Sequence, residues 1–321
     1  MEQGDDTRPD QIAFGIACIL VSVLFMAFAD AVVKLVSAEL TLWQVFAARA
    51  LMALPILVPL MLVRKAGFRP RTPRWTWLRS VLLVLTWIAF YSSLPELKLS
   101  VAAVAVYTNP IITALLSAAL IGEKVSPRRW GGVLLGFLGV VAILRPGTDA
   151  FSWYALLPLL AALLYSLSMI LTRSKCRDET PLTLSFTLNS AFLITGLIVT
   201  ILLALANLDE GTQGSAPFLL GNWGAMGVRE WGVMALLGAL MALYSAGTAK
   251  AYQIAPPSVI ATFDYAYLVS AALWGFVFFA EQPDLLTVCG MVLITAAGLL
   301  VAAPGRRRTP AVIPAGEPGP R

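Results

Sequence analysis

The chain has 321 residues, 59% of them hydrophobic and 13% charged, with a formal net charge of +5. Soluble domains use about 45–50% apolar and about 25% charged residues, so this composition excludes a soluble domain and predicts a protein of the lipid bilayer. The chain has no His, and its 3 Cys lie far apart, which argues against a metal site, a disulfide framework or a bound cofactor. We attribute the positive charge to loop arginines and not to a nucleic-acid partner.

Ten stretches of the sequence are apolar for about 15–25 residues, the length that crosses about 30 Å of hydrocarbon at about 1.5 Å per residue. A lipid-exposed backbone must satisfy its own hydrogen bonds, and these stretches lack the alternation of barrel strands, so we expect helices. The predicted spans are residues 12–36, 42–63, 75–94, 101–121, 130–144, 153–171, 182–205, 231–250, 259–279 and 285–303. The long connection at 206–230 is expected to be a solvated loop.

The basic residues predict the orientation of the chain, because cytoplasmic connections hold the excess of Lys and Arg. With both termini in the cytoplasm, 18 of the 23 basic residues fall in cytoplasmic segments, four fall outside and Arg49 lies within a span. The cytoplasmic set is Arg8, Arg64, Lys65, Arg69, Arg71, Arg74, Arg79, Lys124, Arg128, Arg129, Arg173, Lys175, Arg177, Lys250, Arg306, Arg307, Arg308 and Arg321. The sequence therefore predicts ten helices with the N- and C-termini inside.

Two stretches, 101–143 and 259–302, share one pattern: an apolar span, an acidic residue, a short turn and a second apolar span dotted with glycine. Aligned on Glu123 and Glu281, the two stretches agree at fixed offsets. The matched pairs are Val101 with Val259, Tyr107 with Tyr265, and Gly132 with Gly290, whereas Gly139 and Gly298 differ by one position. We interpret this pattern as an internal repeat. The glycines of the fifth span, by contrast, are expected only to let helices pack closely.

The repeat predicts a membrane domain made of two halves. Residues 12–145 and 146–303 each hold five spans, between a tail at 1–11 and a Pro/Gly-rich, disordered tail at 304–321. Because five is odd, the second half should lie upside down in the membrane relative to the first. Inverted repeats of this kind build many secondary transporters, which hold the substrate near the midplane between the halves.

Four charged residues fall inside spans, where charge is costly and usually faces protein or water. These residues are Asp30, Lys34, Arg49 and Asp264. Asp30 and Lys34 are four residues apart on one helix and can pair. Arg49 should lie near mid-depth, where it either pairs with a carboxylate or binds substrate, and the sequence leaves both open. Asp264 has no basic residue within a turn of its own helix, so it must be protonated, paired across helices or hydrated.

Polar aromatic residues collect near the middle of the third, fourth, sixth and ninth predicted spans. Aromatics at helix ends usually anchor the protein in the membrane interface, but a phenol in mid-span needs a hydrogen-bond partner. We therefore predict a mid-membrane cavity in which Asp264 is the substrate counter-ion or a proton site. Its predicted lining is Trp87, Tyr91, Tyr107, Asn109, Tyr165, Asp264 and Tyr265. Such a lining suits an amphipathic or cationic small molecule.

An ordered set of residues resembles the ten-helix EamA-type members of the drug/metabolite transporter superfamily. The set is Lys34, Arg49, Asn109 with Pro110, Glu123, Gly132 with Gly139, Glu281, and Gly290 with Gly298. Within that superfamily, residues 27–34 and 265–284 look most like the S-adenosylmethionine uptake transporters. The second half has Leu268 where the first has Pro110, so the ninth helix is expected to be straighter than the fourth.

The resemblance implies a carrier of the bacterial inner membrane that moves a small amino-acid-like, cofactor-like or cationic amphipathic compound by alternating access. It would act as a monomer or a homodimer, with proton coupling left open. Two alternatives belong to other classes. A membrane enzyme would need an acid–base constellation, for which no His is present, and a channel would need rings of like charge or a carbonyl filter.

Overall fold

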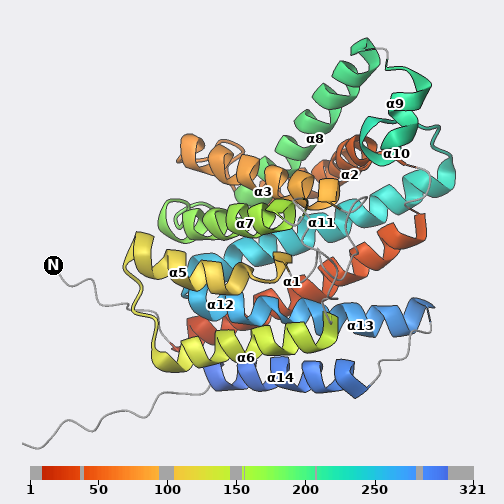
Figure 1. Cartoon of the computed structure of the whole chain (residues 1–321). Coiled ribbons are helices and arrows are strands. Elements are labelled where there is room, and N and C mark those ends of the chain that lie inside the picture. Colours follow the sequence, from red (N-terminus) through yellow and green to blue (C-terminus); the bar gives the residue numbers. More distant parts are fainter. Residues whose placement is uncertain are drawn as a thin grey trace, which may run out of the picture.

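The computed structural model describes residues 9–36, 40–93, 105–144, 154, 156–206, 208–279 and 285–302. In these ranges all the regular structure is helical. Figure 1 shows the long helices lying side by side, with the connections gathered at the two ends of the bundle. Six helices of the described part are long and apolar enough to cross a membrane. The prediction of an all-helical membrane protein is confirmed.

The helices coincide with the predicted spans wherever the chain is described. Nine of them each follow one span: α1 (Pro9–Val36), α2 (Leu42–Val63), α3 (Pro73–Ser93), α5 (Asn109–Ile121), α6 (Pro127–Leu144), α7 (Leu156–Ser174), α8 (Pro181–Ala206), α11 (Val228–Ile254) and α14 (Leu285–Ala302). The ninth span holds two helices, α12 (Pro257–Asp264) and α13 (Ala266–Phe279). Glu281, on which the repeat was aligned, lies outside the described residues.

Glycines bring α2 into close backbone contact with two neighbouring helices. A Cβ atom on Gly196 of α8 would lie 2.7 Å from the carbonyl oxygen of Trp43, and one on Gly238 of α11 would lie 2.8 Å from the carbonyl oxygen of Arg49. Both approaches are too short for any side chain larger than hydrogen. Therefore α2 is packed closely between α8 and α11 through the small glycine residues.

The glycines of the fifth span have the packing role that was predicted for them. Helices α6 and α14 lie against each other, as the lower part of Figure 1 shows. A Cβ atom on Gly139 would lie 2.7 Å from the carbonyl oxygen of Gly290, and one on Gly132 would overlap the side chain of Val301. Gly136 leaves room for the ring of Tyr265.

The fourth and ninth spans are both interrupted. Residues 105–106 are helical and 107–108 form a turn before α5, while a turn at Tyr265 separates α12 from α13. Both turns keep right-handed dihedral angles, with φ −73° and ψ −11° at Thr108, and φ −58° and ψ −22° at Tyr265. The ninth span, for which a straighter helix than the fourth was expected, is therefore interrupted as well. The break occurs without a proline, and side-chain hydrogen bonds flank it, from Tyr252 to Asp264 and from Tyr267 to Asp30.

The connection at 206–230 is more ordered than the expected solvated loop. It contains two short helices, α9 (Glu210–Ser215) and α10 (Pro217–Leu220), and it packs on the first turn of α2. The indole of Trp43 donates a 2.7 Å hydrogen bond to the carbonyl of Leu219, and the side-chain amide of Gln44 donates a 2.8 Å hydrogen bond to the carbonyl of Gly224. The connection therefore covers one end of the bundle, at the upper right of Figure 1.

Asp209 begins α9 as its N-cap. Its carboxylate accepts hydrogen bonds from the hydroxyl and the backbone N–H of Thr212, at 2.6 and 3.0 Å. These bonds favour the charged form and lower the pKa of Asp209 from its ordinary value. The residue is fully exposed, so its role is local to this connection.

Candidate functional site

Asp264 ends α12 inside the bundle, at the interruption of the ninth span. Its side chain is buried, and Oδ2 accepts hydrogen bonds from the hydroxyls of Tyr252 at 2.6 Å and Tyr165 at 3.3 Å. Tyr252 comes from the end of α11 and Tyr165 from the middle of α7. Of the states that the sequence allowed for this carboxyl, the structure shows pairing across helices with two phenols, and no cation of the described part of the chain bonds to it. A carboxyl group in such a place is costly unless a cation, a proton or water reaches it.

A second carboxylate is hydrogen-bonded to the other side of the interruption. Asp30 of α1 accepts a 2.5 Å hydrogen bond from the hydroxyl of Tyr267, in the first turn of α13. The ring of Tyr267 stacks on that of Tyr107, with the centroids 5.6 Å apart and the planes at 30°. Tyr107 lies within electrostatic range of both Asp30 and Asp264.

These side chains form one group, which we call the carboxylate–tyrosine row. It consists of Asp30, Tyr267, Tyr107, Asp264, Tyr165 and Tyr252. The row crosses the bundle from α1, through the broken ninth span, to α7 and α11. It therefore joins residues of both halves of the chain at the two interrupted spans.

Arg49 lies beside the row, on helix α2. Only 6% of the residue is exposed, and its Cζ lies 5.6 Å from the ring centroid of Phe46 and 5.2 Å from that of Phe192. It is close enough to Asp30 and Tyr91 for its charge to act on both. Its Nε and Nη2 nevertheless have no hydrogen-bond partner among the described residues. The predicted pairing of Asp30 with Lys34 falls on a side chain outside the described set.

Trp87 and Tyr91 lie one turn apart on α3 and stack on each other, with the centroids 5.4 Å apart and the planes at 24°. Both are half-buried and pack against the same hydrophobic core as Tyr165 and Tyr267. Phe218 of α10 meets the far side of Tyr91 edge-on, with the centroids 5.9 Å apart. The aromatic pair therefore lies between the row and the connection that covers this end of the bundle.

The structure places the other two predicted lining residues differently. Asn109 begins α5 and is buried, with Oδ1 unpartnered among the described residues, and its carbonyl accepts a 3.2 Å hydrogen bond from Ser166, next to Tyr165. Tyr265 turns toward α6, where its hydroxyl donates a 3.3 Å hydrogen bond to the carbonyl of Val133. Asn109 thus leaves an acceptor near the row, while the ring of Tyr265 packs between helices.

Sequence reasoning missed Tyr252 and did not include Tyr267 in the lining. Tyr252 was left out because the eighth span was expected to end at residue 250, whereas α11 continues to Ile254. The sequence did hold a sign of this contact, because Pro256 and Pro257 come just after the end of α11 and predict a turn between α11 and α12. Such a turn brings residues at the end of α11, such as Tyr252, close to residues of α12, such as Asp264. Tyr267 lies two residues after Tyr265, where the ninth span is interrupted. The sequence held no sign of that interruption, so it held no sign of the role of Tyr267 either.

Glu123 closes the other end of the bundle, away from α9 and α10. Its carboxylate accepts hydrogen bonds from the hydroxyl of Ser258 and, at 2.9 Å, from Arg129. The backbone N–H of Ser258 also points to it, at 3.5 Å. Ser258 is in the first turn of α12, where negative charge is favoured by the helix dipole. The helix that ends in Asp264 is thus tied at its start by a second carboxylate.

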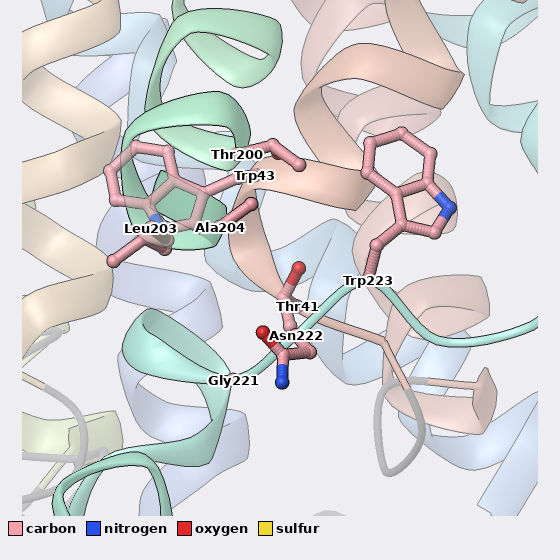
Figure 2. A pocket seen from close by; sticks show the side chains of 8 residues that line it. All are labelled: Thr41, Trp43, Thr200, Leu203, Ala204, Gly221, Asn222 and Trp223. Carbon is pink, nitrogen blue, oxygen red and sulfur yellow. The ribbon is translucent and has the colours of Figure 1, made fainter. Parts of the chain in front are cut away.

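A small cavity of about 60 Å³ lies under the connection at 206–230, shown in Figure 2. Trp43 and Trp223 stand on opposite sides of it, with Thr41 and Asn222 between them. The cavity shares no residue with the carboxylate–tyrosine row. Its place at the end of the bundle makes it a gap beneath a covering segment and not the predicted mid-membrane site.

Comparison with known proteins decides the family. A model of the EamA-like transporter family matches residues 13–145. A riboflavin transporter of Rhizobium johnstonii is 30% identical over 276 residues, which cover 85% of this chain and 83% of the relative. The chain belongs to the EamA-like transporter family. This membership makes it a multi-pass membrane transporter of bacteria that moves a small metabolite, and not an enzyme.

Two further matches refine what this EamA-like transporter resembles. An S-adenosylmethionine uptake transporter of Rickettsia prowazekii is 24% identical over 288 residues, which cover 89% of this chain and 92% of the relative. The predicted kinship with that group is therefore present, but the riboflavin transporter matches at higher identity. A solved crystal structure that covers 91% of this chain has a TM-score of 0.71 at 18% identity and shows the same fold.

Proposed function

We propose that this EamA-like transporter is an alternating-access carrier whose substrate binds at the carboxylate–tyrosine row. The observation that supports this most strongly is Asp264, a buried carboxylate at a helix break that is held by two phenols from other helices. Broken helices that carry polar groups at mid-depth are where inverted-repeat carriers bind their substrates. The unpartnered Oδ1 of Asn109 adds an acceptor beside it.

The two halves are proposed to be inverted repeats, and the helix contacts support this. A two-fold exchange of the halves relates α1 to α7, α2 to α8, α3 to α11, the fourth span to the ninth, and α6 to α14. Under this exchange the observed contacts fall into related pairs: α1–α11 with α3–α7, α2–α11 with α3–α8, and α1–α12 with α5–α7. The interruptions also fall at the matched residues Tyr107 and Tyr265.

We keep the predicted orientation, with both termini in the cytoplasm, because of the excess of basic residues in the segments that it places inside. Glu123 with Ser258 then closes the cytoplasmic end, and Phe218 on Tyr91 closes the outer end. Alternating access requires that these two contacts open in turn.

The substrate is proposed to carry a flat aromatic ring and a polar or cationic group. The stacked rings of Tyr107 and Tyr267 belong to the row, and the stacked pair of Trp87 and Tyr91 adds aromatic surface between the row and the connection at 206–230. The named substrates of the two relatives, riboflavin and S-adenosylmethionine, both contain a flat nitrogen heterocycle with a polar tail. Asp264 would take a cationic or donor group of such a molecule.

Transport by purified protein in liposomes tests the proposal. Saturable uptake and counterflow of riboflavin or S-adenosylmethionine would support a carrier, whereas flux that rises without saturation would favour a channel. Asp264→Asn separates two roles of the carboxylate. A counter-ion role predicts weaker substrate binding at every pH, and a proton role predicts loss of the response to an imposed pH gradient. Unchanged transport in both conditions would reduce Asp264 to a structural residue.

A further inference from the structure

Arg49 has an open pair of donors in the middle of the protein. The two unpartnered atoms, Nε and Nη2, lie on the same edge of the guanidinium group. Their N–H bonds are parallel, and this edge matches two acceptor oxygens in one plane, as in a carboxylate. The residue is 6% exposed, so water does not take the place of such a partner freely.

Its surroundings compensate the charge of Arg49 only in part. Phe46 and Phe192 offer ring faces to the cation, but a ring face accepts no directed hydrogen bond from the edge that is open. Asp30 is near enough to act on the charge, yet its recorded hydrogen bond comes from Tyr267. A buried donor without a partner destabilises a protein, and a core arginine with this defect is expected where a ligand completes it.

The position of the residue is fixed by the helix that carries it. Gly196 and Gly238 bring α8 and α11 into backbone contact with α2 on either side of Arg49. A shift of α2 that brought the guanidinium closer to a carboxylate would have to break these close backbone contacts. Among the described residues its Nε and Nη2 have no partner, and its charge acts on Tyr91, Tyr244 and Asp30.

From this we propose that Arg49 binds a pair of coplanar acceptor lone pairs on the substrate, so that the transported molecule presents an acceptor group to α2 and a donor or cationic group to Asp264. This proposal rests on the substrate site proposed above and narrows it to bipolar molecules. Two sources of the acceptor fit: the two oxygens of a carboxylate on an amino-acid-like tail, and one ring carbonyl oxygen of a flat heterocycle, whose two lone pairs can accept from both N–H groups.

Thermal unfolding of purified variants, with and without probe compounds, tests the assignment. Arg49→Met removes the charge and both donors at similar volume. We expect a Tm at or above that of the wild type without ligand, because an unsatisfied buried charge is lost, together with loss of ligand stabilisation. Arg49→Lys keeps the charge without the paired donors, and should bind probes more weakly than the wild type but more tightly than Arg49→Met. The affinity lost in Arg49→Met should be about tenfold to hundredfold.

Arg79 provides the matched control. It is also buried, and its Nη1 lacks a partner among the described residues, but its Nε donates a 2.6 Å hydrogen bond to Thr172 of α7, so the edge that is open in Arg49 is engaged here. Arg79→Met should therefore lower the Tm of the unliganded protein. A similar fall of the Tm in Arg49→Met would show that Arg49 is a structural residue as well, and would overturn the proposal.

The probes distinguish the two sources of the acceptor group. S-adenosylmethionine and its decarboxylated analogue differ only in the carboxylate, and riboflavin supplies ring carbonyl oxygens. If Arg49→Met weakens binding of S-adenosylmethionine only, Arg49 recognises the carboxylate of the tail. If Arg49→Met weakens binding of riboflavin, Arg49 recognises the ring. Equal binding of every probe by Arg49→Met and the wild type would overturn the proposal.

Failure of the proposed function gives a different pattern. If no probe stabilises the wild type, the substrate class proposed above is contradicted. The Tm of unliganded Arg49→Met still decides the role of the arginine. A value below that of the wild type means a structural residue, and a value at or above it means a group kept for a ligand.

Discussion

The fourth and ninth spans are interrupted at matched positions but in different surroundings. In the fourth span, Pro110 stands in the first turn of α5 and has no N–H to continue the helix across Tyr107 and Thr108. In the ninth span the matching residue is Leu268, whose N–H donates a 3.1 Å hydrogen bond to the carbonyl of Tyr265. There the break is flanked by two carboxylate–phenol hydrogen bonds, Tyr252 to Asp264 and Tyr267 to Asp30.

The difference teaches which half of the site can change its shape. A proline is a covalent feature, so the break in the fourth span persists in every state of the protein. The break in the ninth span depends on hydrogen bonds to two carboxylates, and these are the groups that a cation, a proton or a substrate donor would engage. Substrate binding is therefore expected to act on the ninth span more than on the fourth.

Proline scanning of α13 should give the largest effect and test whether the break is local. Leu273→Pro lies in the helix interior and should cost about 3 kcal/mol or more beyond Leu273→Ala, because it removes a hydrogen bond and introduces a clash. Leu268→Pro lies where the other half already has a proline, and should cost only about 1 kcal/mol beyond Leu268→Ala. Unfolding in mixed micelles with SDS measures both differences. Equal costs at the two positions would contradict a break at Tyr265.

Removal of the phenol hydroxyls should give the next largest effect. Tyr252→Phe takes one hydrogen bond from the buried carboxylate of Asp264 and should lower the free energy of unfolding by about 1.5–3 kcal/mol, the value of a hydrogen bond to a charged group. Tyr265→Phe is the matched control, because its hydroxyl bonds only to a neutral carbonyl at 3.3 Å. An effect in the control as large as that in Tyr252→Phe would show that Asp264 does not hold the break.

Most of the fold could be predicted because membrane spans are long and apolar, and because glycine, proline and charge stand out against them. The predicted ends of α2 and the predicted packing of Gly132 and Gly139 match the structure for this reason. The break at Tyr265 could not be predicted, because the hydrogen bonds beside it join residues of different helices. Tyr267 bonds to Asp30, which is far away in sequence, and Asp264 bonds to Tyr252, which lies across the turn between α11 and α12.

The candidate site was predictable in type and less so in arrangement. A carboxyl group in mid-span such as Asp264 stands out in any apolar sequence. Its partners Tyr252 and Tyr165 do not stand out. A tyrosine looks the same in the sequence whether its ring lies at the membrane interface or points into the protein. The ring of Tyr265 likewise packs toward α6, where Gly136 leaves room for it, and its own helix gives no sign of this.

Loss of the charge of Glu123, which bonds to Ser258 and Arg129, should lower the free energy of unfolding less than loss of the phenol hydroxyls does. Glu123→Gln keeps an acceptor for Ser258 but loses the charge that meets Arg129 and the first turn of α12. We expect a loss of about 1 kcal/mol in the free energy of unfolding, because the Arg129 side chain is 23% exposed and the pair is partly screened. Transport should still saturate, with a changed maximal rate. An unchanged rate and stability would argue against a closing contact at this end.

The smallest effect is expected from Pro110→Ala, which restores an N–H in the fourth span. The break there should persist in part, because the hydroxyl of Thr108 donates a 2.6 Å hydrogen bond to the carbonyl of Ala105 and so stabilises the turn. The free energy of unfolding should change by less than about 1 kcal/mol. A large loss of transport in Pro110→Ala would mean that the fourth span contributes as much to the conformational change as the ninth.

The most direct test of the central claim is a crystal structure of the transporter with a metabolite that stabilises it and that it transports. The account predicts that the metabolite lies at the carboxylate–tyrosine row, with its ring against Tyr107 and its donor group at Asp264. A metabolite bound instead in the cavity between Trp43 and Trp223, with the row unchanged, would contradict it.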